Sequence, residues 1–235
     1  MDATIDGMAS ASLTRFGPRS GARGVVLLLH GGQERSEDPV LRRHASWWRM
    51  LLVARAVSGQ ASRRDVAVWL LRYQARGWNS GPGREPAPVR DARWALEQVR
   101  AAHPGAPVVL LGHSMGGRTA NYAADDPDVV GVVALAPWLP PGEPVGSKPL
   151  LVLHGTVDRW TSPEASRLHT ERVRAASGQA AWFPVPGAAH SMVTSLSRWH
   201  AFARDCSLGL LGVQDLPADV REALESTGRG QSPVR

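Results

Sequence analysis

Short runs of apolar residues alternate along this chain with segments whose apolar residues recur at helical spacing. Apolar runs bounded by glycine or proline are typical of strands buried on both faces of a sheet, and a spacing of three or four residues is typical of helices packed on it. The expected strands cover residues 24–32, 65–71, 108–111, 129–136, 149–155 and 180–185. The expected helices cover residues 41–57, 87–102 and 162–176, a short segment after residue 117, and a last main helix along Met192, Leu196, Trp199 and Ala203. The alternation predicts an α/β fold, a mostly parallel sheet with helices on both faces.

The length of the chain sets the expected domain organisation. Its 235 residues suffice for one α/β domain with a full core. We expect this domain to span residues 1–208, with a possible edge strand within the irregular residues 1–20. Residues 209–235 are expected to form a C-terminal extension, with a small amphipathic helix before residue 226 and a disordered end at residues 227–235.

Composition argues against several classes of protein. The formal net charge is +6, and nearly all positive charge is arginine because Lys148 is the only lysine. The arginines are spread along the chain without a recognition motif, so no nucleic-acid partner is expected. The single cysteine, Cys206, cannot form an intramolecular disulfide. The longest apolar run, residues 25–29, is too short to span a bilayer, and the first ten residues lack the pattern of a secretory signal. We therefore expect a cytoplasmic protein without a membrane partner.

The stretch VVLLGHSMGGRTA, residues 108–120, places Ser114 between glycines, after a buried strand and before a helix. Strand, tight turn and helix form the setting of a nucleophile elbow. A serine on so sharp a turn has a strained backbone, and side chains two residues before and after it would collide, which favours glycine at Gly112 and Gly116. The alternative interpretation is a glycine-rich turn with an incidental serine.

Candidate site residues gather where the expected strands end, because ligands bind at the carboxyl ends of strands in such sheets. These ends carry His30–Gln33, Tyr73–Trp78, Ser114, Trp138, Asp158 and His190. Serine, acid and histidine follow one another in the chain order of the α/β-hydrolase triad.

The sequence resembles the α/β-hydrolase-fold serine hydrolases, which include esterases, lipases, thioesterases and aminopeptidases. The resemblance covers most of residues 24–205 and rests on HGG at 30–32, GHSMGG at 112–117, HGTVDRWTSP at 154–163 and PGAAH at 186–190. It implies that Ser114 is the nucleophile, Asp158 the acid and His190 the base. It further implies a serine hydrolase that cleaves a carboxylic ester or related acyl compound through an acyl-serine intermediate.

The same resemblance suggests how the oxyanion would be bound, and it leaves one choice open. Two N–H donors are needed for this charge. The backbone N–H of Met115 is implied for one, and that of Gly32 or Gln33 for the other. No spacing of histidine, cysteine and acidic residues suggests a metal site, and Ser114 stands where a dinucleotide-binding motif needs glycine, so no metal or other cofactor is expected.

Other residues compete for these roles. Glu143 follows the strand before the one that precedes Asp158, and it is the better rival for the acid. Asp125, Asp126 and Asp128 lie in a turn at the opposite end of the sheet. The histidines His30 and His154 precede glycine at strand ends, and we interpret them as shaping loops.

The expected cleft is open and small. Trp78, Trp138 and Trp160 follow strand ends, and we expect them to line a pocket for a small-molecule acyl substrate. Residues 137–148, where larger members of the family insert a cap, hold four prolines and two glycines. Proline blocks helix interiors, so the fold is expected to be minimal, without a cap domain. The alternatives to an esterase are a non-catalytic ligand-binding or sensor protein on the same fold, or an acyltransferase or thioesterase.

Overall fold

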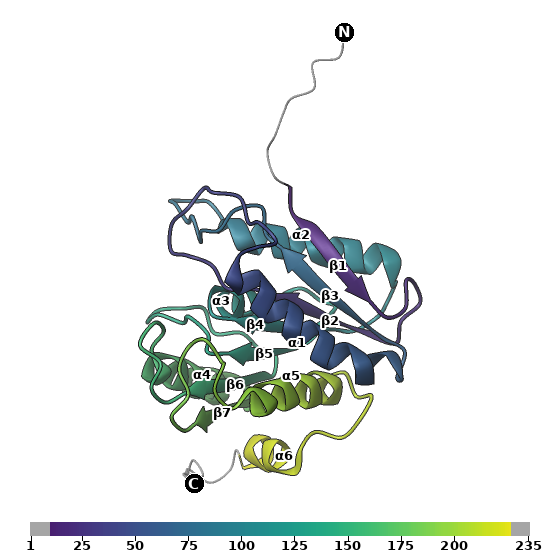
Figure 1. Ribbon diagram of the computed structural model, residues 1–235. Coiled ribbons are helices and arrows are strands. Elements are labelled where there is room, and N and C mark those ends of the chain that lie inside the picture. Colours follow the sequence, from purple (N-terminus) through teal and green to yellow (C-terminus); the bar gives the residue numbers. More distant parts are fainter. Residues whose placement is uncertain (1–9, 227–235) are drawn as a thin grey trace.

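A seven-stranded, mostly parallel sheet forms the centre of the computed structural model, which describes residues 10–226 (Figure 1). The strand order is β1-β3-β2-β4-β5-β6-β7, and only β1 runs antiparallel to its neighbour. The strands are β1 (Ser12–Phe16), β2 (Gly24–Leu29), β3 (Val66–Arg72), β4 (Val108–His113), β5 (Val129–Leu135), β6 (Leu150–Gly155) and β7 (Ala180–Val185). Every residue of β2 and β4 is buried, which explains the continuous apolar runs 25–29 and 108–111 within them.

Helices cover both faces of this sheet. Figure 1 shows α1 (Ala45–Ser62) and α5 (Leu196–Leu210) side by side in front of it, and α2 (Ala87–Ala102), α3 (Met115–Ala123) and α4 (Pro163–Ser177) behind it. This division follows from right-handed crossovers, because the step from β2 to β3 runs in the opposite direction from the later steps. The predicted α/β fold is therefore confirmed. No helix in the described part of the chain is long and apolar enough to cross a membrane.

Two helices begin about four residues later than the sequence predicts, and α3, which starts at Met115, begins earlier than residue 118. α1 begins at Ala45 rather than residue 41, since the backbone of His44 is extended, with φ −72° and ψ 133°. α5 begins at Leu196 rather than Met192, because Met192 and Ser195 have positive φ angles of 59° and 58° and form a turn. Met192 is nevertheless buried, so its apolar side chain marks packing and not helix.

The two ends of the described chain pack on the domain. β1 is the edge strand expected within residues 1–20. α5 continues to Leu210, so the expected boundary after residue 208 falls inside this helix. Val220 and Ala223 of α6 (Ala218–Glu225) belong to the main hydrophobic core, while the disordered end expected at residues 227–235 lies outside the described residues.

The topology creates a crevice between two loops. After β2 the chain moves outward to β3 and then returns past β2 to β4, so the loops that follow β2 and β4 diverge. Such a switch point is where ligands bind in open α/β sheets. Between β5 and β6 the chain forms turns and no helix, as expected for a fold without a cap.

Candidate active site

Ser114 lies on a strained turn between β4 and α3. Its backbone angles are φ 56° and ψ −121°, a conformation that a non-glycine residue rarely adopts. A Cβ on Gly112 would lie 2.2 Å from the carbonyl oxygen of Gly116, and a Cβ on Gly116 would lie 2.1 Å from that of Leu29. Both positions therefore require glycine, and the elbow can present the serine side chain at the end of the strand.

Asp158 and His190 come from the loops that follow β6 and β7, and their side chains meet. The Nδ1 atom of His190 lies 2.8 Å from Oδ2 of Asp158, and both side chains are largely buried. The other carboxylate oxygen, Oδ1, accepts hydrogen bonds from the backbone N–H groups of Trp160 (2.8 Å) and Thr161 (3.0 Å). A carboxylate only accepts, so His190 donates from Nδ1, and this tautomer leaves Nε2 with a lone pair for use as a base.

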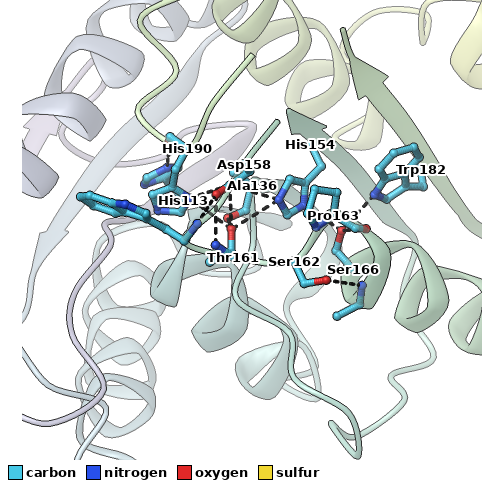
Figure 2. A network of polar contacts seen from close by, with 12 residues as sticks. His113, Ala136, His154, Asp158, Thr161, Ser162, Pro163, Ser166, Trp182 and His190 are labelled. Atoms are coloured by element: carbon cyan, nitrogen blue, oxygen red, sulfur yellow. Dashed lines mark hydrogen bonds and ion pairs between the residues drawn. The ribbon is translucent and has the colours of Figure 1, made fainter. Parts of the chain in front are cut away.

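A second histidine binds the same carboxylate, as Figure 2 shows. Nε2 of His154 lies 3.2 Å from Oδ2 of Asp158, and its Nδ1 lies 2.7 Å from the Ser166 hydroxyl. That hydroxyl also accepts a hydrogen bond from the Trp182 indole at 3.0 Å, while the Thr161 hydroxyl lies 2.8 Å from Oδ2 of Asp158. The carboxylate is thus held in one orientation by groups from two loops and from β6, and Ser166 of α4 contacts the other side of the His154 ring.

These contacts decide the ionisation state of Asp158. Burial disfavours the charged form, but the hydrogen bonds from His154 and His190 outweigh it. The backbone N–H groups of Thr161 and Trp160 act in the same direction, so the pKa of Asp158 lies well below its usual range. The residue is a carboxylate at neutral pH, as a partner of a histidine base must be.

Ser114 and His190 line one cleft of about 290 Å³ at the switch point of the sheet. The described residues show no hydrogen bond between the Ser114 hydroxyl and the His190 ring, whose partners are Asp158 and Thr161. In enzymes without substrate this bond is often long and shortens only on binding. The structure therefore brings the three sequence-predicted triad residues to one site, with the hydrogen bond between Asp158 and His190 already formed.

The backbone around the cleft distinguishes the two candidate oxyanion donors. The N–H of Gln33 is already bonded to the carbonyl oxygen of Arg76 at 2.8 Å. The N–H groups of Gly32 and Met115 have no partner within the described residues. A Cβ on Gly32 would lie 2.4 Å from both the Arg76 carbonyl oxygen and the end of the Met115 side chain, so only glycine fits at this position of the loop. We infer that Gly32 and Met115 are the two donors.

The three tryptophans expected around the cleft divide into two groups. Trp138 and Trp160 line it, and the Trp160 ring lies 5.4 Å from that of His190. Trp78 lies elsewhere, with only 3% of its surface exposed. Its ring packs against Trp138 at 6.2 Å and has the Arg118 guanidinium 4.1 Å above it. This aromatic–cation packing makes Trp78 part of the core, and it is not among the residues that line the cleft.

The rival acids have other partners. Oε1 of Glu143 lies 2.6 Å from the Arg118 guanidinium, and the carboxylate is 4% exposed. No hydrogen bond in the described structure joins Glu143 to His190. The remaining three acids form surface ion pairs: Asp125 with Arg93, and Asp126 and Asp128 with Arg100.

Three residues that sequence reasoning did not include among the predicted site residues contact Asp158 or His190. His154 was interpreted as shaping a loop, although its position four residues before Asp158 at a strand end was a signal that it could reach the acid. Thr161 contacts both Asp158 and His190. Nε2 of His113 lies 3.1 Å from the carbonyl oxygen of His190, and since a carbonyl accepts, the ring donates and anchors the loop that carries His190.

Comparison with family models shows which family the chain belongs to. A family model described as "Alpha/beta hydrolase family" matches residues 26–225. The chain belongs to the alpha/beta hydrolase family. No match was found among curated proteins.

Solved structures of other alpha/beta hydrolases share this fold at low sequence identity. A lidless α/β serine hydrolase from Xanthomonas campestris is 18% identical, with a TM-score of 0.60, and the match covers 84% of this chain and 87% of the other. The esterase Est2 from Thermogutta terrifontis is 18% identical, with a TM-score of 0.62, and the match covers 88% and 90% of the two chains. A serine hydrolase homologue from Coxiella burnetii is 16% identical, with a TM-score of 0.60 and 83% and 89% coverage.

Proposed function

We propose that this alpha/beta hydrolase cleaves small carboxylic esters through an acyl-serine intermediate. The observation that carries the proposal is the 2.8 Å contact between His190 and Asp158 beside the cleft that Ser114 lines. A serine hydroxyl is a weak nucleophile until a neighbouring base removes its proton, and the base needs a partner that fixes its tautomer. Asp158 supplies that partner.

The reaction follows from these positions. Nε2 of His190 takes the proton of the Ser114 hydroxyl while Oγ attacks the carbonyl carbon of the ester. The tetrahedral intermediate collapses as His190 gives the proton to the leaving alkoxide, which departs as the alcohol. Water then attacks the acyl-serine by the same steps, with His190 again as base, and releases the carboxylic acid and the free serine.

The negative charge of each tetrahedral intermediate falls on the former carbonyl oxygen. The N–H groups of Gly32 and Met115 would donate to it from fixed backbone positions. Each such donor is worth about 3 kcal/mol of transition-state stabilisation, because it is already oriented before the charge develops. The strained elbow at Ser114 would serve the same purpose by holding the nucleophile next to these donors.

The substrate is expected to carry a short acyl group. The cleft volume of about 290 Å³ lies at the lower end of the range for small-molecule sites. Est2 from Thermogutta terrifontis has been solved with propionate and with butyrate bound, both of which are short acids. No helix between β5 and β6 covers the cleft. A long acyl chain would therefore find little apolar protein surface to pack against.

A series of 4-nitrophenyl esters tests the proposed substrate class. We expect kcat/KM to be highest for short acyl groups and to fall beyond about eight acyl carbons. Each CH₂ group adds about 0.8 kcal/mol of binding free energy only where the protein surface buries it. The rate should rise smoothly through the solubility limit of each ester. A sharp jump in rate when an emulsion forms would contradict an open cleft, and faster cleavage of a thioester or an amino-acid anilide than of any ester would contradict the ester class.

A further inference from the structure

Arg49 places a positive charge at the wall of the cleft. It lies on the first turns of α1, and it lines the cleft together with Ser46, which is one turn away on the same helix face. Its charge is one cause of the lowered pKa of His113, after burial and the neighbouring His190. The positive charge of Arg49 therefore acts on His113, which also lines the cleft, and not only on the outer surface of α1.

Within the described part of the chain the Arg49 side chain has no partner, which sets it apart from the other partly buried arginines. Among residues 10–226 it is the only partly buried arginine whose side chain forms neither a hydrogen bond nor an ion pair. Partial burial of a guanidinium removes water from the charge, and it lowers the pKa of Arg49. A desolvated cation without a partner is unfavourable, so the cleft retains a charge that a bound anion would stabilise.

The cleft combines polar and aromatic groups. Its lining includes the polar side chains of Gln33, Ser46 and Arg49 and the aromatic side chains of Trp138 and Trp160. Glu34 is the one carboxylate among the lining residues described, and it is exposed and forms no ion pair with Arg49. The guanidinium is a planar fork of donors that matches a carboxylate or phosphate with two parallel hydrogen bonds.

We propose that Arg49 binds an anionic group of the substrate, so that the preferred ester is a small one bearing a carboxylate or similar anion in addition to the scissile bond. The inference rests on the proposed ester hydrolysis and narrows it to a substrate class. The anion can belong to the acyl part or to the alcohol part of the ester, since Arg49 and the nucleophile line the same cleft.

Two matched pairs of esters separate these cases. The acyl pair is mono-4-nitrophenyl adipate and its neutral methyl ester, and the alcohol pair is 4-acetoxybenzoate and its neutral methyl ester. The readout is the ratio of kcat/KM for the anionic ester to that for its neutral partner. We expect Arg49→Gln to lower this ratio about tenfold in one of the pairs, mainly by raising KM for the anionic ester. A tenfold change is the effect expected from the loss of one hydrogen bond to a charged group. Arg49→Lys should retain part of the ratio, because it keeps the charge but loses the fork.

Arg55→Gln is the matched control. Arg55 lies on the same helix, is exposed and does not line the cleft, so this variant changes the net charge equally and should leave the ratio unchanged. If Arg49→Gln leaves the ratio unchanged in both pairs while the wild type hydrolyses the esters, the role of Arg49 is wrong and the proposed ester hydrolysis stands. If the wild type hydrolyses none of the four esters, both proposals are overturned.

Discussion

Replacement of Ser114 by alanine is expected to lower kcat for 4-nitrophenyl esters by at least about 10⁴-fold, because triad residues act as a unit and the reaction has no other nucleophile. The fold should be retained, since alanine adds no atoms to the crowded turn between Gly112 and Gly116. Steady-state kinetics of the purified variant, with its thermal unfolding recorded alongside, measure both effects.

A serine outside the cleft provides the control for that variant. The hydroxyl of Ser58 on α1 bonds only to the backbone carbonyl of Arg55 in its own helix, so Ser58→Ala should keep the kcat of the wild type. A Ser114→Ala variant that retains more than about a tenth of the wild-type kcat would contradict the acyl-serine mechanism.

Replacement of Asp158 by asparagine is expected to cost about 10⁴-fold in rate, the loss seen when a triad aspartate in another hydrolase is changed in this way. The hydrogen bonds explain the direction. The backbone N–H groups of Trp160 and Thr161 require an acceptor at Oδ1, so the new amide would place its NH₂ group toward His190. His190 would then present a lone pair at Nδ1 and carry its proton on Nε2, where the base is needed. A pH–rate profile of the variant measures the loss.

Glu143→Gln separates this effect from the general loss of a buried carboxylate. Glu143 pairs with Arg118 in a buried cluster that makes no contact with His190 in the described structure. The variant should lose about 1–3 kcal/mol of stability, because a buried charged hydrogen bond is weakened, and should keep its turnover. If Glu143→Gln abolished turnover while Asp158→Asn retained it, the acid would have to be reassigned to the loop after β5.

The fold could be predicted from the sequence because strands that are buried on both faces of the sheet appear as runs of apolar residues. The buried runs 25–29 of β2 and 108–111 of β4 are wholly apolar, and the helices between strands show their core-facing spacing. The need for glycine at Gly112 is determined by its contact with Gly116, only four residues away, and a local contact of this kind is readable in a single sequence.

The parts that could not be predicted depend on contacts between distant loops. The choice of Gly32 over Gln33 follows from the hydrogen bond of Gln33 to Arg76, which comes from the loop after β3. The burial of Trp78 follows from its packing with Trp138 and with Arg118 of α3, which no local pattern reveals. The bond from His154 to Asp158 likewise depends on how the turn after β6 closes.

Covalent labelling with a fluorophosphonate tests the central claim most directly, because the reagent reacts fast with a serine that is activated by its neighbours and slowly with an ordinary serine. The Ser114 oxygen would displace fluoride and form a phosphonate ester, which mass spectrometry of the digested protein locates. The account predicts one adduct per chain on the peptide that contains Ser114, and no adduct on the Ser114→Ala variant. Absence of labelling in the folded wild-type protein, or an adduct on a different residue, would contradict it.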